Sequence, residues 1–365
     1  MHICVVTRSM DRGGAERVIT RLLTEWNSDN VHCSLILTEH AERFYTLPRE
    51  VEVYELEEYS GGNVKNKTKK YTELRQTVRA IRPDAVLAMP EDIGVYTILY
   101  LMFTGIPVFV SERNDPRMMP AQKLTRLLRR LLYPFARGFI FQTHTAAEYF
   151  PGYVQRKSIV LPNPLDSEKM PEPWEGEREK VVVSAGRFEP QKNFPLLVRS
   201  FAMFHIEHPD WTLRIYGDGP GKKDILDAAA KYGLPKDSLE LPGVSHQLPE
   251  DMRKCSVFVL SSDYEGMPNA MIEAMAVGLP CIATSTPSGG PKELIVNNTN
   301  GFLVPVGSSG MIAEKLEYYA ANPDAVIKHG TEGLKIKRRL DSRTIAAKWK
   351  NFMLKRSPAK DNIEL

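Results

Sequence analysis

The sequence predicts an α/β fold made of two doubly wound parallel-sheet domains, each Rossmann-like, that face each other across a cleft. Short apolar segments alternate with helix-forming stretches along almost the whole chain. A polar, proline-rich segment interrupts this alternation once, near the middle of the chain. At 365 residues, the chain is also longer than one typical domain, so two domains are the natural expectation.

The first run of alternating segments covers residues 1–164 and predicts the amino-terminal domain. Seven short apolar strands are expected, each followed by a helical stretch, near residues 2–7, 31–37, 51–56, 85–89, 107–111, 138–142 and 157–161. The run ends at Pro162-Asn-Pro164, where the two prolines break regular structure.

The second run covers residues 165–342 and predicts the carboxy-terminal domain. It opens with the segment Pro171–Lys180, which is polar and proline-rich and is therefore expected to be a linker. Six strands are then expected, near residues 181–185, 212–216, 238–241, 256–261, 280–284 and 302–304.

Composition and charge describe a globular protein without a bias toward one kind of charged partner. The formal net charge is +3, and neither this charge nor any motif predicts nucleic-acid binding. Four cysteines without CxxC spacing lie in or beside expected strands, which is typical of reduced core residues: Cys4, Cys33, Cys255 and Cys281. The chain passes from Met1 directly into a strand without a signal peptide, so we expect a cytoplasmic protein.

Two glutamates border the start of an expected helix in the second domain. Glu265 lies in a loop broken by Gly266 and Pro268, and Glu273 lies eight positions later, in a helix capped by Asn269. The free N–H groups of a helix start bind anions. Two carboxylates around such a site suit a ligand with hydroxyls at both ends and phosphate in the middle, such as a nucleotide-sugar. Two solvated glutamates at a buried helix start are the ordinary alternative.

Four further loops carry glycine or a cation at the carboxyl end of an expected strand, where open α/β sheets bind ligands. They are Arg12-Gly-Gly-Ala-Glu-Arg17, Ser184–Asn193, Ile215-Tyr-Gly-Asp-Gly-Pro220 and Ser288-Gly-Gly-Pro-Lys-Glu-Leu294. Together with the spacing of Glu265 and Glu273, these loops resemble those of the family 4 glycosyltransferases, which have the GT-B fold. The resemblance extends over residues 1–345, and its motifs are densest in 184–304.

This resemblance implies that the second domain binds a nucleotide-diphosphate sugar, with a UDP-sugar as the expected donor, and that the first domain binds the acceptor. It also implies a last helix, about 343–365, that crosses back to the first domain. The catalytic candidates are Glu265, Arg187 and Lys192. Arg187 and Lys192 match the family's diphosphate-binding cations, since arginine grips a phosphate in bidentate fashion and lysine acts as a point charge. Ordinary surface cations on a loop are the alternative.

The carboxylates and backbone groups near the helix start complete the donor site that the resemblance implies. Glu265 would bind hydroxyls of the transferred sugar, and Glu273 would accept hydrogen bonds from the ribose. The other donor-binding candidates, several of them backbone groups, are Gly14, Gly186, Gly243, Val244, Met267, Asn269, Ala270 and Met271.

The sequence contains no Asp-x-Asp pair, the motif that typically holds a divalent ion in metal-dependent transferases. Breaking a sugar–phosphate bond leaves growing negative charge on the diphosphate, which fixed cations and amide donors must then stabilise. We therefore expect no metal and no other cofactor beyond the co-substrate. The resemblance also implies retention of anomeric configuration, by same-face attack in which the leaving phosphate helps to deprotonate the acceptor.

The acceptor-side candidates lie in the first domain. Gly13 belongs to the Gly-Gly loop, and Glu112, Arg113 and Asn114 follow the strand near 107–111. Many relatives carry a histidine in this second loop, whereas Arg113 or Asn114 occupies that position here, so a histidine base is not expected. His144 opens a helix after a strand, and capping, acceptor-side lining and a purely structural role all stay open for it.

The segment 118–137 combines a leucine pattern with five basic residues and no acidic one. Six apolar side chains share one helix face: Leu124, Leu127, Leu128, Leu131, Leu132 and Phe135. The basic residues are Lys123, Arg126, Arg129, Arg130 and Arg137. One interpretation packs the leucine face on the domain and leaves a solvated basic face. The other turns the basic face toward an anionic membrane surface, near a lipid-diphosphate acceptor.

Together with what the resemblance implies, these observations predict a metal-independent, retaining glycosyltransferase that moves a hexose or N-acetylhexosamine to a glycan or polyprenyl-diphosphate-linked glycan, as in capsule, exopolysaccharide or O-antigen synthesis. Peripheral attachment to the inner face of the plasma membrane is left open. Two other functions share the architecture. A GT-B-fold sugar-nucleotide epimerase would need no acceptor surface, and a non-catalytic nucleotide-sugar-binding protein would be expected to lack Glu265 or Lys192.

Overall fold

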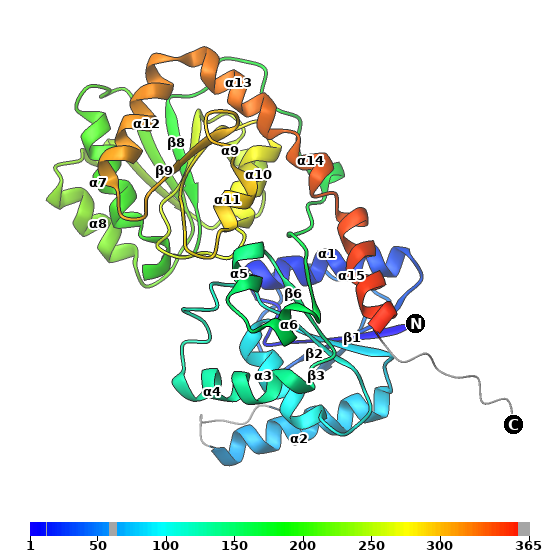
Figure 1. Cartoon of the computed structure of the whole chain (residues 1–365). Coiled ribbons are helices and arrows are strands. Elements are labelled where there is room, and N and C mark those ends of the chain that lie inside the picture. Colours follow the sequence, from blue (N-terminus) through cyan, green and yellow to red (C-terminus); the bar gives the residue numbers. More distant parts are fainter. Residues whose placement is uncertain (12, 58–63, 357–365) are drawn as a thin grey trace, which may run out of the picture. The chain divides into compact units, whose positions relative to one another are not determined.

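The computed structural model describes residues 1–11, 13–57 and 64–356, which form two compact units (Figure 1). Unit 1 comprises residues 1–164 and the helix that begins at Ser342, and unit 2 comprises Leu165–Asp341. Each unit contains its own parallel sheet and its own apolar core. Residues 357–365, where the resemblance implied that the last helix continues, lie outside the described residues.

Unit 1 is built on a seven-stranded sheet whose order is β3-β2-β1-β4-β5-β6-β7. Its strands are β1 (His2–Thr7), β2 (His32–Leu37), β3 (Glu52–Glu55), β4 (Ala85–Ala88), β5 (Val108–Ser111), β6 (Gly138–Phe141) and β7 (Ser158–Val160). Its helices are α1 (Gly14–Ser28), α2 (Val64–Ile81), α3 (Glu91–Leu101), α4 (Lys123–Leu132), the short 3-10 helix η1 (Tyr133–Phe135), α5 (His144–Glu148), α6 (Gly152–Gln155) and α15 (Ser342–Arg356).

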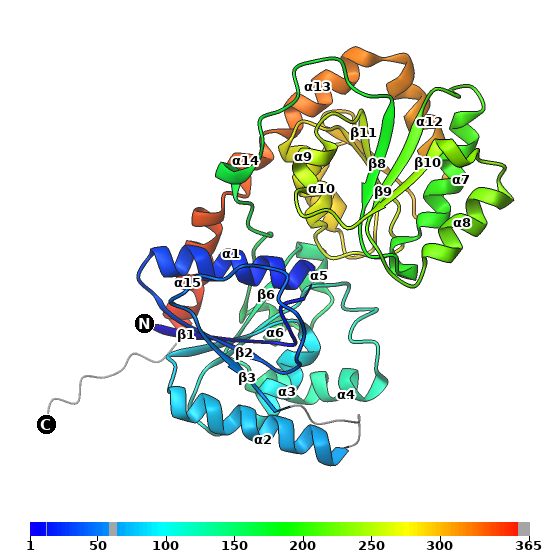
Figure 2. The ribbon, with the colours of Figure 1, turned by 180° about the vertical axis from the view of Figure 1, so that it is seen from behind.

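Helices cover both faces of this sheet because alternate strand residues point to opposite sides. Cys4 and Val6 of β1 join the core under α2 to α6, whereas Ile3 and Val5 join the core under α1 and α15. Figures 1 and 2 show these two helical layers from opposite sides. The last helix is tied to the first, since the Trp26 indole donates to the Ala346 carbonyl at 3.0 Å.

Unit 2 is built on a six-stranded sheet whose order is β10-β9-β8-β11-β12-β13. Its strands are β8 (Val181–Ala185), β9 (Thr212–Tyr216), β10 (Leu239–Gly243), β11 (Val257–Leu260), β12 (Cys281–Thr284) and β13 (Gly301–Val304). Its α-helices are α7 (Phe194–His205), α8 (Lys222–Lys231), α9 (Leu248–Met252), α10 (Asn269–Ala276), α11 (Gly290–Leu294), α12 (Ser309–Ala321), α13 (Pro323–Gly333) and α14 (Ile336–Arg339). Its 3-10 helices are η2 (Ser167–Lys169), η3 (Pro190–Lys192) and η4 (Lys236–Ser238).

The predicted α/β class and all thirteen expected strands are confirmed, because each expected segment coincides with one strand of the structure. The four cysteines are buried and unpaired, as expected for reduced core residues. One local prediction is wrong. Asn269 is the first residue of α10, and Pro268 occupies the cap position in an extended conformation.

Helix α4 is oriented differently from both interpretations of the segment 118–137. Leu124, Leu127 and Leu131 are exposed, whereas Arg129 is buried at 4% exposure. The guanidinium of Arg129 donates to the carbonyls of Met119 and Pro116, both at 2.9 Å. A basic face that is wholly turned to solvent or membrane is therefore wrong, because two of its five cations, Arg126 and Arg129, donate to carbonyls of the neighbouring loop.

Within the ranges that the structure describes, no helix is both long enough and apolar enough to cross a membrane.

Candidate active site

The strand order of unit 2 creates a switch point between β8 and β11, which are neighbours in the sheet although β9 and β10 lie between them in the sequence. Their following loops leave the sheet in different directions, and such a point is where open α/β sheets bind ligands. The loop after β8 carries Gly186 and Arg187, and the loop after β11 carries Glu265. The topology therefore brings together two motifs that lie far apart in the sequence.

Lys192 and Glu265 form an ion pair at this switch point. Their side chains are only 19% and 11% exposed, so the pair is largely shielded from water. The hydroxyl of Ser262 also donates to the Glu265 carboxylate, at 3.2 Å. The ammonium group of Lys192 and the carboxylate of Glu265 are thus in direct contact within the candidate site.

Three further side-chain hydrogen bonds fix the loop after β8 to the loop after β11. The Asn193 amide donates to Asp263 at 2.8 Å, and the Gln191 amide donates to the Tyr264 carbonyl at 2.9 Å. The third runs from the Ser261 hydroxyl to the Lys192 carbonyl, at 2.8 Å. Because these bonds involve neighbours of the ion pair, they position Lys192 and Glu265 without relying on the charges themselves.

A third loop, which follows β12, closes on the Glu265 loop from another side. The hydroxyl of Ser288 donates to the Glu265 carbonyl. A Cβ atom at Gly290 would lie 1.6 Å from the Gly266 carbonyl oxygen, so only glycine allows this approach. The Ser-Gly-Gly motif therefore has a packing role against the Glu265 loop.

Glu273 lies one turn inside α10, and its side chain is only 3% exposed. Met267 and Met271 are also buried, whereas Asn269 and Ala270 at the helix start are half-buried. The partly exposed helix start is where an anion could reach backbone N–H groups. The roles of these residues in donor binding stay predictions.

The remaining donor-side candidates lie at the carboxyl ends of three adjacent strands. The Gly186 N–H donates to the Tyr216 carbonyl at 3.0 Å, and the Gly217 N–H donates to the Gly243 carbonyl at 2.8 Å. A Cβ at Gly217 would lie 1.9 Å from the Gly186 oxygen, so glycine is required there. Val244 follows β10 and is half-buried, and Arg187 is exposed. These residues line one edge of the sheet.

In unit 1, Gly13 and Gly14 form the start of α1, at the carboxyl end of β1. Gly13 precedes the helix in an extended conformation, and its carbonyl accepts from the Tyr45 hydroxyl at 3.3 Å. A Cβ at Gly13 would overlap the Glu16 carboxylate, which lies within the first turn. Arg12, the first residue of this motif, lies outside the described residues.

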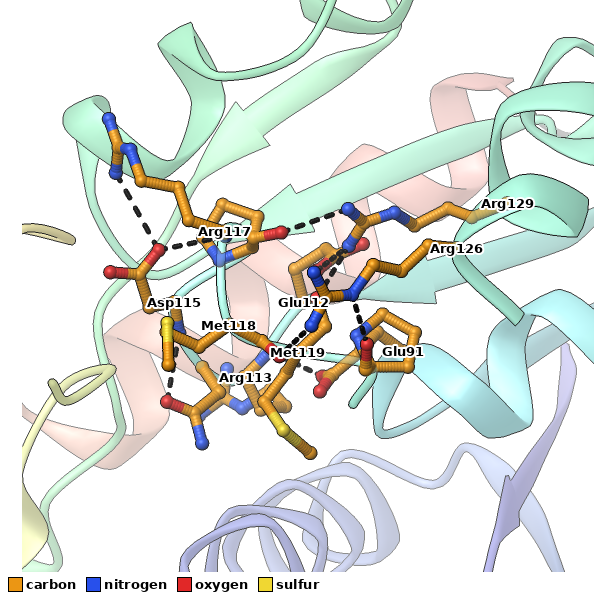
Figure 3. A network of polar contacts seen from close by, with 12 residues as sticks. Glu91, Glu112, Arg113, Asp115, Arg117, Met118, Met119, Arg126 and Arg129 are labelled. Atoms are coloured by element: carbon orange, nitrogen blue, oxygen red, sulfur yellow. Dashed lines mark hydrogen bonds and ion pairs between the residues drawn. The ribbon is translucent and has the colours of Figure 1, made fainter. Parts of the chain in front are cut away.

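Glu112 is the first residue after β5, and it is buried; Figure 3 shows it near Arg129. It accepts from the Tyr133 hydroxyl and lies 3.5 Å from a guanidinium nitrogen of Arg129. Burial raises the pKa of Glu112 to about 7, although the charge of Arg129 opposes the rise. Its side chain therefore contacts Tyr133 and Arg129 inside unit 1, and an acceptor-side role for Glu112 stays a prediction.

Arg113 is the next residue, and its contacts also lie within unit 1. Its guanidinium donates to the Ser111 hydroxyl at 3.4 Å and to the Asn163 side chain, and its backbone N–H donates to Glu91 at 3.2 Å. Burial lowers the pKa of Arg113 to about 9. Asn114 is half-buried, and its side chain accepts from the next backbone N–H at 2.8 Å.

His144 is exposed at the first residue of α5, directly after the carboxyl end of β6. The capping role that was left open for it belongs to Thr143, whose hydroxyl accepts from the Ala146 N–H at 3.0 Å. His144 thus lies at the same sheet edge as Arg113, and an acceptor-side role stays a prediction.

Sequence reasoning missed three residues that hold the acceptor-side loop. Glu91 begins α3 and is buried, with a pKa that burial raises. Asn163 is buried and accepts from both Arg113 and Gln142. Arg129 reaches from α4 to carbonyls of the loop, as Figure 3 shows. The only sequence signal was the position of Asn163 between two prolines, which indicated a linker.

Among the residues that the structure describes, no three histidine, cysteine, aspartate or glutamate side chains are grouped as a metal site would require. The expectation of a metal-independent site still rests on the sequence pattern and stays a prediction.

Two family models match the chain, one for each unit. Residues 12–169 match the model described as Glycosyltransferase Family 4, and residues 166–332 match the model described as Glycosyl transferases group 1. Together the two matches cover most of both sheets.

Individual relatives agree with these models. The chain is 26% identical over 326 residues to the GalNAc-alpha-(1->4)-GalNAc-alpha-(1->3)-diNAcBac-PP-undecaprenol alpha-1,4-N-acetyl-D-galactosaminyltransferase of Campylobacter jejuni, covering 87% of this chain and 88% of that protein. It is 24% identical to the amylovoran biosynthesis glycosyltransferase AmsD of Erwinia amylovora, covering 85% and 87%.

Solved structures share the fold. The structure of Anabaena HepE in complex with UDP and glucose has a TM-score of 0.82 and 19% identity, covering 96% of this chain and 99% of that one. Staphylococcus aureus TarM has a TM-score of 0.81 and 13% identity, covering 96% and 98%. Because two family models match consecutive parts of the sequence and the two parallel sheets reproduce the GT-B fold, the chain belongs to the family 4 glycosyltransferases.

Proposed function

We propose that this glycosyltransferase moves a hexose or N-acetylhexosamine from a UDP-sugar to a lipid-linked glycan, with retention of anomeric configuration and without a metal ion. The family assignment sets aside the two alternative functions, the epimerase and the non-catalytic binding protein. The observation that carries the proposal is the shielded Lys192–Glu265 pair at the switch point of unit 2.

The pair supplies the two kinds of group that transfer from a nucleotide-sugar needs. Lys192 offers a fixed positive charge for the diphosphate, and the exposed Arg187 on the same loop adds a second cation. Glu265 offers a carboxylate for hydroxyls of the transferred sugar. The start of α10 adds backbone donors between Glu265 and Glu273, the residue proposed to bind the ribose.

The proposed reaction follows from where charge develops. The acceptor hydroxyl forms a bond to the anomeric carbon on the face from which the sugar–phosphate bond breaks, and the departing phosphate oxygen takes the hydroxyl proton. Lys192 and Arg187 stabilise the negative charge that accumulates on the diphosphate. In the absence of an Asp-x-Asp pair, these cations take the role of a divalent ion.

The acceptor and donor classes are suggested by the relatives. The Campylobacter protein and an Escherichia coli relative that is 35% identical over 167 residues are both named for undecaprenyl-diphosphate acceptors. The Escherichia coli protein is also named for UDP-Gal, and HepE binds UDP and glucose. We therefore propose a polyprenyl-diphosphate-linked glycan as acceptor, which would bring the enzyme to the inner face of the plasma membrane.

The function is tested by incubating the enzyme with a panel of UDP-sugars and polyprenyl-diphosphate-linked glycans. The expected product is a glycan that is one sugar longer, with free UDP released in equal amount and with the donor's anomeric configuration retained in its NMR spectrum. Conversion of the UDP-sugar without acceptor, or inversion at the anomeric carbon, would contradict the proposal.

A further inference from the structure

The exposed leucines of α4 form a continuous apolar ridge on unit 1. Leu124, Leu127 and Leu131 lie on one helix face, and Phe135 extends the row beyond the helix end. These four side chains, here called the leucine ridge, are between 53% and 64% exposed. Phe103, which is 85% exposed, packs edge-on against Phe135 at 6.1 Å between ring centroids. Large apolar patches of this kind on a soluble protein commonly mark interaction sites.

The outward direction of the leucine ridge is fixed by contacts on the opposite side of the helix. Arg129 donates to two carbonyls of the preceding loop and lies 3.5 Å from Glu112, and Leu132 is buried in the core. A rotation of α4 that buried the ridge would break these contacts and bring Arg129 out. The exposure of the leucine ridge is therefore a consequence of the contacts that hold α4 on unit 1.

A cavity of about 630 Å³ lies at the end of the ridge. Phe103 and Phe135 belong to its apolar wall, together with Leu101. Four cations complete the lining, and none of the described lining side chains is acidic: Arg137, Lys157, Lys355 and Arg356. We call this cavity the cationic pocket.

Backbone carbonyls hold cations of the pocket, and among the described residues no carboxylate forms an ion pair with them. Lys157 donates to the Pro134 carbonyl at 2.9 Å, and Arg356 donates to the Arg156 carbonyl at 2.9 Å. Burial lowers the pKa of Lys157, and the charges of Arg137 and Arg356 lower it further. The positive charges are thus close enough to repel one another, and an anion in the pocket would relieve that repulsion.

The leucine ridge connects the pocket to the acceptor-side loop. The pocket residues Arg137 and Lys157 directly precede β6 and β7, so the pocket lies at the amino edge of the sheet. The loop that carries Arg113 follows the carboxyl end of β5. Helix α4 has ten residues and is therefore about 15 Å long, and Figure 2 shows it beside α3.

We propose that the leucine ridge and the cationic pocket form one docking surface for an anionic phospholipid bilayer, in which the ridge enters the headgroup–acyl boundary and the pocket binds a lipid phosphate. An apolar row bordered by Lys123 and Arg130, without an acidic neighbour on its helix, matches the chemistry of such an interface. The inference rests on the proposed function, because a lipid-linked acceptor requires the enzyme at a membrane.

The test is co-sedimentation of the full-length protein with phosphatidylcholine vesicles that do or do not contain phosphatidylglycerol. We expect binding only to the anionic vesicles, and release as salt rises. Arg137→Glu with Lys355→Glu should weaken binding by at least ~30-fold, since each basic residue near such a surface contributes about fivefold. Leu127→Asn with Leu131→Asn should abolish binding. Phe103→Ser changes only an exposed side chain and should also weaken binding to the anionic vesicles.

The matched control is Lys222→Glu with Lys236→Glu, which makes the same change in net charge on unit 2 and should leave vesicle binding unchanged. Equal loss in this control, or a wild type that ignores phosphatidylglycerol, would overturn the proposal. The proposal would also be overturned if the wild type were a dimer and a ridge variant a monomer. It would likewise be overturned if glycerol 3-phosphate stabilised the wild type but not the pocket variant, while neither protein bound vesicles.

Transfer to a short soluble acceptor separates this inference from the proposed function. All the ridge and pocket variants should retain wild-type rates with that acceptor. A wild-type protein that transfers sugar to this acceptor but binds no anionic vesicles would overturn the docking surface alone. A protein that binds vesicles but transfers no sugar to any acceptor would instead contradict the proposed function.

Discussion

At the scale of single residues, the two glutamates of unit 2 have different surroundings. Glu265 lies in a loop, paired with Lys192 and held by Ser262. Glu273 lies in α10 among buried neighbours. The spacing of eight positions predicted one residue before the helix and one inside it, and the structure confirms that placement. The roles that we propose for them remain to be tested.

We expect Glu273→Ala to weaken binding of UDP by about 10- to 100-fold, because a hydrogen bond to a charged group contributes about 1.5–3 kcal/mol. Glu265→Ala should leave UDP binding nearly unchanged and lower the rate of sugar transfer. Isothermal titration with UDP and a transfer assay distinguish the two effects. Glu273→Gln serves as control for packing. Equal loss of UDP affinity in both alanine variants would contradict this division of roles.

Glu112 should make stability depend on pH. Burial raises its pKa from the ordinary value of 4.5 to about 7, so folding favours its protonated form. That contribution to stability is fully present below about pH 4.5 and is lost as the pH rises through 7. Glu112→Gln stays neutral, so its melting temperature should rise relative to the wild type between pH 5 and 8. A difference in melting temperature that does not change with pH would show that Glu112 does not titrate in this range.

At the scale of elements, α4 shows what a sequence pattern leaves undetermined. Helical spacing correctly places the leucines on one face, but it does not say which face meets the core. The decisive contacts are long-range, since Arg129 reaches carbonyls in the loop before the helix and Glu112 after β5. Local hydrophobicity could not predict that an arginine would be buried while three leucines stayed exposed.

The two arginines at 129 and 130 provide a direct test of this arrangement. Arg129→Met should lower the free energy of unfolding by about 3–5 kcal/mol, because it leaves Glu112 and loop carbonyls buried without their partner. Arg130 is exposed, so Arg130→Met should change stability by less than about 0.5 kcal/mol. Urea denaturation measures both. Similar values for the two variants would contradict the inward position of Arg129.

At the scale of the whole molecule, the alternation of strands and helices was sufficient to predict thirteen strands and the α/β class. The order of strands within each sheet was not available from the sequence, because neighbours such as β8 and β11 are separated along the chain. That order creates the switch point and so brings Lys192 to Glu265. The motifs that contain Lys192 and Glu265 could be found in the sequence. Their contact in the folded protein depends on long-range strand pairing, which the sequence pattern did not predict.

The same limit applies to the end of unit 1. Trp349 and Met353 of α15 are buried in a core that also contains Trp26 of α1. Only the resemblance to a family implied that the last helix returns to the first domain. The residue pattern of α15 does not itself indicate which domain the helix packs against. The docking surface that we propose also depends on α15, because Lys355 and Arg356 line the cationic pocket.

The central claim is that Lys192 and Arg187 stabilise the leaving diphosphate in place of a metal ion. The most direct measurement is the rate of transfer from the UDP-sugar in EDTA and in magnesium, for the wild type and for Lys192→Ala. We predict equal wild-type rates under both conditions and a loss of about 100- to 1,000-fold in the variant, the scale for removing one charge-stabilising group. A wild-type activity that EDTA abolishes and magnesium restores would contradict the claim.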